Sequence, residues 1–220
     1  MTQSNANTNN DKGSKVWDRF AEGYSKQPIK DEEAYQKKLQ VTQRYFKPTD
    51  SVVEIGCGTG GTSIIHSAYV RKILATDFSA KMVEIARQRA KEAGVKNVEF
   101  QQASVEQLEL PRNSQDVVLG LSILHLLPNK EDAMRKVHSW LKPGGLFVTS
   151  TVCAGDMGAS TKFFLKTIMP VAQFFGFIPN FYAFTKADLE ESFRKTGFDI
   201  EYEWQPDKKD AAVFIIGKKK

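Results

Sequence analysis

The fold of this chain is decided by one stretch, Val52-Val53-Glu54-Ile55-Gly56-Cys57-Gly58-Thr59-Gly60-Gly61. It begins with a short apolar run, typical of a buried parallel strand, and breaks into a glycine-rich turn before the helix-compatible residues 62–70. Glycine permits positive φ and lets a ligand approach the backbone, while free N–H groups at a helix start favour an electron-rich partner. The stretch therefore predicts a strand, a turn and a helix that hold a nucleotide-like cofactor.

Glu54 discriminates between two kinds of cofactor. Gly56, Gly58 and Gly61 also satisfy G-x-G-x-x-G, the dinucleotide fingerprint, which is a weak signal alone. A carboxylate at the end of a buried apolar strand costs several kcal/mol unless a cation or a hydrogen-bond donor meets it. Such a carboxylate repels a pyrophosphate and attracts an ammonium or a sulfonium. The loop thus favours a cationic cofactor, and NAD remains the alternative.

Composition indicates a single domain in a reducing compartment. With 220 residues, of which 41% are hydrophobic, the chain can bury one core, and residues 1–14 are a polar leader that we expect to be disordered. Cys57 and Cys153 lie far apart, so neither a disulfide nor a metal site is predicted, and a cytoplasmic location is favoured. The net charge is +5, but the Lys and Arg residues are scattered, so no nucleic-acid partner is expected.

The rest of the chain reads as alternating helices and strands. Two helices are expected between Lys15 and Phe46, and later helices begin after the N-cap residues Ser79 and Thr185. Strands are expected at residues 71–77, 98–102, 116–122, 146–148, 199–204 and 211–216, the last two as closing antiparallel strands.

Several motifs resemble one family. The pattern E-x-G-x-G-x-G of residues 54–60 resembles motif I of the class I S-adenosylmethionine-dependent methyltransferases. Residues 17–24 resemble the F/W-D-x-x-A-x-x-Y signature of the methyltransferases similar to the ubiquinone and menaquinone biosynthesis enzymes. Asp116 begins a D-x-V element, and an L-H-x-L turn at 124–127 and an L-K-P-G-G turn at 141–145 follow. The match runs from Lys15 to Ser150 and weakens beyond.

The resemblance implies an α/β fold: a doubly wound, Rossmann-like sheet of seven mostly parallel strands flanked by helices. Residues 15–220 would form one methyltransferase domain, with cap helices at 15–47 and a helical lid inserted at 160–182 after the fifth strand. It also implies S-adenosyl-L-methionine (SAM) as cofactor. The cofactor-binding residues expected are Tyr24, Glu54, Gly56, Cys57, Gly58, Gly60, Asp77, Phe78, Met82, Ala103, Ser104 and Leu121.

Individual roles follow from position and from the family. Asp77 ends the second predicted strand about twenty residues beyond the loop, where a ribose ligand is expected. Phe78 and Met82 would flank the adenine. Ala103 departs from the family, which usually carries an aspartate there to reach the adenine amino group. For Ser104, the alternative to cofactor binding is a role as the N-cap of a short helix. For Tyr24, the alternative is a place in the buried stripe of an amphipathic helix.

His125 is the candidate catalytic base, because it follows the fourth predicted strand and its ordinary pKa leaves it neutral near physiological pH. A packing role for His125 is equally open, and His66 and His138 are interpreted as surface or packing residues. The apolar residues 160–182 predict a lid over a small lipophilic acceptor such as a quinone precursor, a lipid amine or a thiol. Core packing, and shallow docking on a membrane, are the alternatives for this segment. An NAD-dependent oxidoreductase and a non-catalytic SAM-fold interaction protein are the alternative functions.

Overall fold

The computed structural model of the protein describes residues 2–158, 167, 169, 173, 178–206 and 212–220, with side chains from residue 13 onward. The helices are α1 (Thr2–Lys26), α2 (Glu32–Tyr45), α3 (Gly61–His66), α4 (Ala80–Glu92), α5 (Lys130–Trp140) and α8 (Lys186–Lys195). The strands are β1 (Ser51–Ile55), β2 (Lys72–Asp77), β3 (Val98–Gln102), β4 (Gln115–Leu121), β5 (Leu141–Val152), β6 (Phe198–Trp204) and β7 (Ala212–Lys219).

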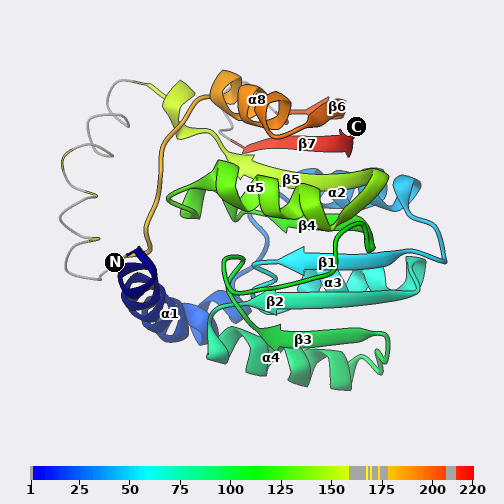
Figure 1. Ribbon diagram of the computed structural model, residues 1–220. Helices are drawn as coiled ribbons and strands as arrows, with labels where there is room; N and C mark the ends of the chain where they lie inside the picture. Colours follow the sequence, from blue (N-terminus) through cyan, green and yellow to red (C-terminus); the bar gives the residue numbers. More distant parts are fainter. Residues whose placement is uncertain (1, 159–166, 168, 170–172, 174–177, 207–211) are drawn as a thin grey trace.

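The strands form one seven-stranded sheet in the order β3-β2-β1-β4-β5-β7-β6. Strand β7 pairs antiparallel with both β5 and β6, whereas the other pairs are parallel. The chain leaves β1 towards β2 and β3 and then returns to β4 on the other side of β1 (Figure 1). Ligands of doubly wound sheets bind at the carboxyl ends of the strands beside such a reversal. The predicted fold class is confirmed, and the candidate site lies at the ends of β1, β2 and β4.

The side chains of alternate strand residues pack into two hydrophobic cores on opposite faces of the sheet. Val53 belongs to a cluster with residues of α5 and α8, and Val52 belongs to a second cluster with residues of α2 and α4. Glu54 follows the alternation and lies on the α2 and α4 side, where Ser63 of α3 contacts it. Burying a large aliphatic or aromatic side chain contributes ~1.5–3 kcal/mol each, so both helix layers hold the sheet in place.

The first helix is longer than the sequence predicts. Residues 2–14, which we expect from their composition to be disordered, form the first half of α1. Val16 and Ala21 are buried on the side of α1 that faces the protein, and a Cβ at Gly13 would lie 3.1 Å from the Phe78 ring. Residues 2–14 contain no proline that would end a helix before the packed residues Val16 and Ala21, so the helix extends through this leader.

Local signals predict the starts of two helices correctly. Ser79 Oγ accepts the Met82 N–H at 3.1 Å, and Thr185 forms a capping box with Asp188, so both predicted N-caps are confirmed. Strand β5 begins earlier than expected, at Leu141, with a register shift opposite Gln115 and Val117 that accommodates the glycine turn. The predicted lid at 160–182 lies largely outside the described residues. Within the described residues, no helix is both long and apolar enough to cross a membrane.

Candidate functional site

The glycine loop between β1 and α3 is shaped by packing on one side and open on the other. Gly56 and Gly60 have positive φ, and a Cβ there would lie 2.5 Å from Ile123 Cδ1 and 2.7 Å from Phe100 Cε1, respectively. At Gly58 the nearest atom to an added Cβ is Tyr24 Cε1 at 3.8 Å, and at Gly61 nothing lies within 4 Å. The backbone of Gly58 and Gly61 is therefore open to a ligand.

Asp77 ties this loop to the start of α4. Its Oδ2 accepts the Gly58 N–H at 2.9 Å, and its Oδ1 accepts the Ser79 N–H at 2.9 Å. Burial raises the pKa of Asp77, and these two backbone hydrogen bonds counteract part of the rise. A carboxylate oxygen has two lone pairs, so each oxygen can accept one further hydrogen bond. Asp77 thus combines a structural role with the acceptors that two neighbouring hydroxyls require.

Glu54 is a buried carboxylate with little compensation. It is 3% exposed, and its Oε2 accepts a hydrogen bond from the Ser63 hydroxyl. Burial raises the pKa of Glu54 to about 7, opposed by the Ser63 hydroxyl and reinforced by the negative charge of Asp77. Among the described residues, no Lys, Arg or His forms an ion pair with it. A cationic ligand beside the loop would supply the missing charge.

Helix α1 covers the loop through the motif at residues 17–24. Asp18 Oδ1 accepts the Ser79 hydroxyl at 2.6 Å and the Lys81 N–H at 3.1 Å, so it docks α1 on the N-terminus of α4. Ala21 is fully buried, and Tyr24 lies beside Gly58 with 48% of its surface exposed. The spacing of the motif therefore places its Asp, Ala and Tyr along the side of α1 that faces the protein.

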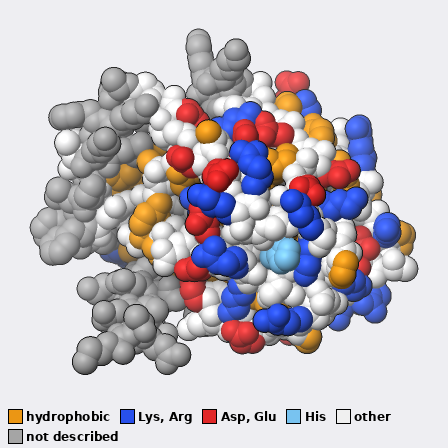
Figure 2. Space-filling model, turned by 45° about the horizontal axis from the view of Figure 1, so that its top comes forward, with side chains coloured by type: hydrophobic (Ala, Val, Ile, Leu, Met, Phe, Trp, Pro, Cys, Tyr) orange, Lys and Arg blue, Asp and Glu red, His pale blue; other side chains and the backbone are white. Residues whose placement is uncertain are grey.

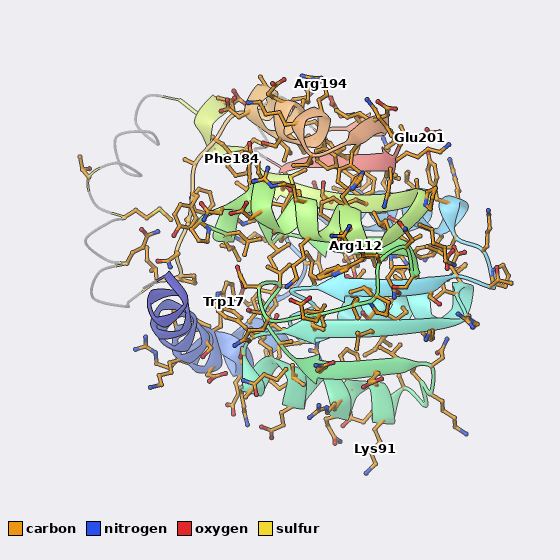
Figure 3. The ribbon with its side chains drawn as sticks, viewed as in Figure 1. Trp17, Lys91, Arg112, Phe184, Arg194 and Glu201 are labelled. Atoms are coloured by element: carbon orange, nitrogen blue, oxygen red, sulfur yellow. The ribbon has the colours of Figure 1, made fainter. Side chains whose placement is uncertain are left out.

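Trp17 supports Tyr24 in this position, because their rings meet edge to face with centroids 6.2 Å apart. In Figure 3 Trp17 lies between α1 and the loops at the carboxyl ends of the strands. Tyr24 is therefore half-exposed rather than part of a buried stripe, and its ring lies beside Gly58 of the loop.

Two residues that sequence reasoning missed connect the loop to its surroundings. Arg89 of α4 donates to Thr59 Oγ1 at 2.7 Å and to the Ser25 carbonyl at 2.5 Å, and so joins the loop to the end of α1. Tyr35 of α2 lies with its hydroxyl 3.5 Å from Thr62 Oγ1. No local signal marks either residue, because their partners lie far away in sequence. Asp18 belongs to the motif at residues 17–24, but no local signal marks its role as a cap for α4, because Ser79 and Lys81 lie 61 and 63 positions away.

The residues expected around the adenine lie near Asp77 with differing accessibility. Phe78 is half-buried against Gly13, whereas Met82 is only 1% exposed and lies in the core, because α4 turns it away from solvent. The Ala103 N–H donates to the Asp77 carbonyl at 3.0 Å. Ser104 Oγ accepts the Gln107 N–H at 3.3 Å, so Ser104 does cap the following residues, which form a turn rather than a helix.

Two other predicted cofactor residues lie at the strand ends. Cys57 is buried, and its N–H donates to the Thr76 carbonyl at 2.9 Å, so the loop is held against β2. Leu121 ends β4 and is half-buried, just before Ser122, which has a φ of +60°. The part that each residue plays in binding stays a prediction.

His125 is buried and neutral. It is 7% exposed, and burial lowers its pKa to about 4. Its Nδ1 accepts the Val152 N–H at 3.4 Å, which assigns the proton of the neutral ring to Nε2. Phe181 lies against the ring with centroids 5.2 Å apart, and the Tyr182 N–H donates to the His125 carbonyl at 2.8 Å. In this arrangement Nε2–H is a hydrogen-bond donor, and Nδ1 can accept a proton only after its hydrogen bond with the Val152 N–H breaks.

The other two histidines pack in the structure. His66 is fully buried and meets the Phe46 ring edge to face at 5.0 Å, and His138 meets Phe198 at 5.2 Å. Both fit the packing interpretation. The described residues contain no group of three or more His, Cys, Asp or Glu side chains that could hold a metal ion.

Comparison with known proteins gives a consistent family. The profile of a family described as "Methyltransferase domain" matches residues 46–201. The chain is similar to the "Demethylmenaquinone methyltransferase" of Lactococcus lactis, with 31% identity over 170 residues, or 70% of this chain and 68% of the relative. It is 37% identical over 97 residues to the "Uncharacterized methyltransferase YcgJ" of Bacillus subtilis, which covers 44% of this chain and only 38% of that relative.

The fold is shared as well. The crystal structure of the YcgJ protein from the same organism superposes with a TM-score of 0.68 at 19% identity, and the superposition covers 84% of this chain and 99% of that chain.

Proposed function

From the premise that this chain belongs to the methyltransferase-domain family and is an enzyme with S-adenosyl-L-methionine as its cofactor, we propose that its methyl acceptor is a small, apolar molecule. The acceptor classes that fit are a quinone precursor, a lipid amine or a thiol. The family assignment sets aside NAD, the alternative that the glycine pattern left open. The single observation that best supports a cofactor site at the glycine loop is the pair of buried carboxylates, Asp77 and Glu54, on either side of it.

The two carboxylates suit opposite ends of this cofactor. Asp77 has one further acceptor site on each oxygen for the ribose hydroxyls, and hydrogen bonds to a charged group contribute ~1.5–3 kcal/mol each. Glu54 stands at the methionine end, where an ammonium or sulfonium compensates its buried charge. Tyr24 closes the site from α1, and the uncovered backbone of Gly58 and Gly61 leaves room for the cofactor between them.

When bound, the cofactor supplies an activated methyl group with an excellent leaving group. The chain therefore needs mainly to hold the acceptor in line and to keep water away, and orientation of this kind can contribute ~7–11 kcal/mol. His125 is the residue that we propose beside the acceptor. With its proton on Nε2 it can orient an acceptor oxygen as a donor, and it can act as a base once Nδ1 leaves the Val152 N–H.

Exposed aromatic side chains support an apolar acceptor. Phe20, Tyr24 and Tyr182 are 42%, 48% and 38% exposed, respectively, and the Tyr182 backbone is hydrogen-bonded to His125. Tyr182, which makes this contact with His125, is the last residue of the proposed lid at 160–182. Shallow contact with a membrane surface fits the same aromatic groups.

Other partners and the location form the rest of the proposal. On the face seen in Figure 2, Lys and Arg side chains alternate with Asp and Glu, which suits a small-molecule enzyme better than one that binds nucleic acid. Both cysteines are free thiols, as in proteins of a reducing compartment, and we place the enzyme in the cytoplasm.

Methyl transfer to fractionated extracts tests the acceptor class. The full-length chain is incubated with methyl-labelled SAM and with the organic and aqueous fractions of one cell extract, and labelled products are separated by chromatography. Label in organic-phase products is expected. Label in aqueous products alone would overturn the apolar acceptor, and SAM binding without transfer to any fraction would favour the non-catalytic interaction protein.

A further inference from the structure

Strand β6 changes face part-way along its length. Its sequence from Phe198 to Trp204 has a hydrophobic or aromatic residue at every second position, and in a regular strand these side chains would all share one face. The pairing with β7 shifts between Ile200, opposite Gly217, and Tyr202, opposite Ile216. Such an extra residue in one strand is a β-bulge, which commonly re-aims side chains next to a functional site.

The bulge divides the four side chains between the two cores. Phe198 and Ile200 pack in the cluster that includes Phe193 of α8. Tyr202 and Trp204 pack in the cluster on the opposite face, which includes Val41 of α2. The Tyr202 ring also meets the Phe214 ring at 6.1 Å. Two aromatic side chains that regular alternation would place against α8 therefore face α2 at the edge of the sheet.

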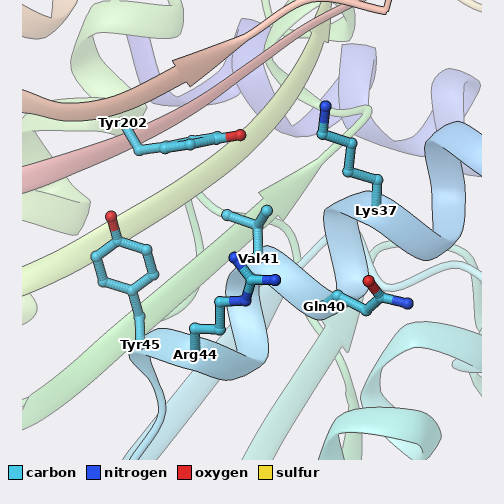
Figure 4. Close-up of a pocket in the computed structure, with 6 residues that line it drawn as sticks. All are labelled: Lys37, Gln40, Val41, Arg44, Tyr45 and Tyr202. Atoms are coloured by element: carbon cyan, nitrogen blue, oxygen red, sulfur yellow. The ribbon is translucent and has the colours of Figure 1, made fainter.

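A cavity of about 510 Å³ lies between α2 and β6. We call it the edge groove, and it is lined by Lys37, Gln40, Val41, Arg44, Tyr45 and Tyr202 (Figure 4). In Figure 4 the two tyrosine rings lie on one side of Val41, Lys37 and Gln40 lie on the other side, and Arg44 lies between. Its volume falls within the ~300–1,000 Å³ of small-molecule sites.

The groove carries polar groups without protein partners. Within the described part of the chain, the side chains of Gln40 and Arg44 and the hydroxyls of Tyr45 and Tyr202 make no hydrogen bond or ion pair. Lys37 Nζ lies 4.1 Å from the centre of the Trp204 ring and forms no ion pair there.

One carboxylate lies near this set. Burial raises the pKa of Tyr45, and the negative charge of Glu201, the residue before Tyr202 in β6, adds to the rise. Its Oε2 lies 3.9 Å from Lys218 Nζ, which offsets that charge. The cationic part of the groove is thus the part around Lys37 and Arg44.

We propose that the edge groove is a binding site for a small aromatic anion, a molecule with one flat ring and a carboxylate or phosphate group. The ring lies against Tyr45, Tyr202 and Val41, and the anionic group lies between Lys37 and Arg44. Aromatic rings stack or meet edge to face with tyrosine, and a guanidinium matches the two oxygens of a carboxylate or phosphate. The site is separate from the cofactor loop, because β6 is the outermost strand and the loop follows β1.

Binding of phenyl phosphate to the full-length chain tests the proposal by calorimetry. Inorganic phosphate supplies the charge without the ring, and benzylamine supplies the ring with the opposite charge. Phenyl phosphate should bind at least tenfold more tightly than either. Equal affinity for benzylamine, or affinity for phenyl phosphate no greater than for phosphate, would overturn the proposal.

Matched variants locate the site. Lys37→Gln and Arg44→Gln should each weaken phenyl phosphate at least fivefold, whereas Lys91→Gln and Arg112→Gln, which change exposed cations elsewhere, should not. All four should keep the wild-type melting temperature and SAM affinity, so a folding defect is separable from loss of the site. Unchanged binding in the first two variants would refute the assignment. A single-stranded oligonucleotide that bound far more tightly than phenyl phosphate, and lost affinity in the same variants, would also refute it in favour of a nucleic-acid surface.

Discussion

Removal of the Asp77 carboxylate should weaken the cofactor more than it disturbs the fold. Asp77→Ala deletes the acceptors for the ribose hydroxyls, and a net loss equal to one charged hydrogen bond, ~1.5–3 kcal/mol, corresponds to about 10- to 150-fold weaker SAM binding. The same change frees the Gly58 and Ser79 N–H groups, each held at 2.9 Å, so the loop loses order and the melting temperature falls as well. Calorimetry with SAM and a thermal melt measure the two effects separately.

Asp116→Ala is the matched control. Asp116 Oδ2 accepts the Ser51 N–H at 2.9 Å and its Oδ1 accepts Lys142 Nζ at 2.6 Å, so this carboxylate also bonds a backbone N–H of the sheet. Asp116 lies near the start of β4, whereas Asp77 lies at the end of β2, so the two carboxylates are at opposite ends of the parallel strands. The control should lower the melting temperature and leave SAM affinity within about twofold. If both variants weakened SAM equally, or if Asp77→Ala left its affinity unchanged, the ribose role of Asp77 would be refuted.

Three further predictions concern neighbouring residues. Because burial raises the pKa of Glu54 from 4.5 to about 7, the folded protein keeps a proton that the unfolded chain releases, and Glu54 lowers the free energy of unfolding as pH rises through this window. Glu54→Gln should therefore raise the melting temperature at pH 8 but not at pH 4, and should abolish a rise in SAM affinity between pH 6 and 8; an unaltered pH profile would count against it. His125→Gln should lower kcat by about 10²- to 10⁴-fold with little change in SAM affinity if His125 acts as a base, and unchanged turnover in rate assays would leave it a packing residue. Arg89→Gln should weaken SAM about tenfold through loss of one charged hydrogen bond of ~1.5 kcal/mol that orders the loop, whereas Arg135→Gln, on α5, should show no effect in the same titration.

The parts of the fold that depend on neighbours in sequence could be predicted from it. Ser79 and Thr185 cap their helices as expected, because a cap needs only the residue and the N–H groups two or three positions later. Asp77 and Glu54 could be located as well, because a polar residue at the end of an apolar strand stands out in sequence.

Features that depend on distant partners could not be predicted. The bulge in β6 is set by the pairing with β7, and the regular alternation from Phe198 to Trp204 conceals it. Arg89 bridges Thr59 and Ser25, which lie 30 and 64 positions away along the chain. Met82 is buried because of how α4 packs, which helical spacing alone does not determine. The helical path of residues 2–14 likewise differs from what their polar composition indicates.

The most direct measurement of the central claim is a calorimetric titration of the full-length chain at pH 8 with SAM, S-adenosylhomocysteine and NAD in parallel. The open backbone at Gly58, the two carboxylates and the cover by Tyr24 predict that both sulfur-containing ligands bind and that NAD does not. Binding of NAD with an affinity equal to or greater than that of SAM would contradict the account.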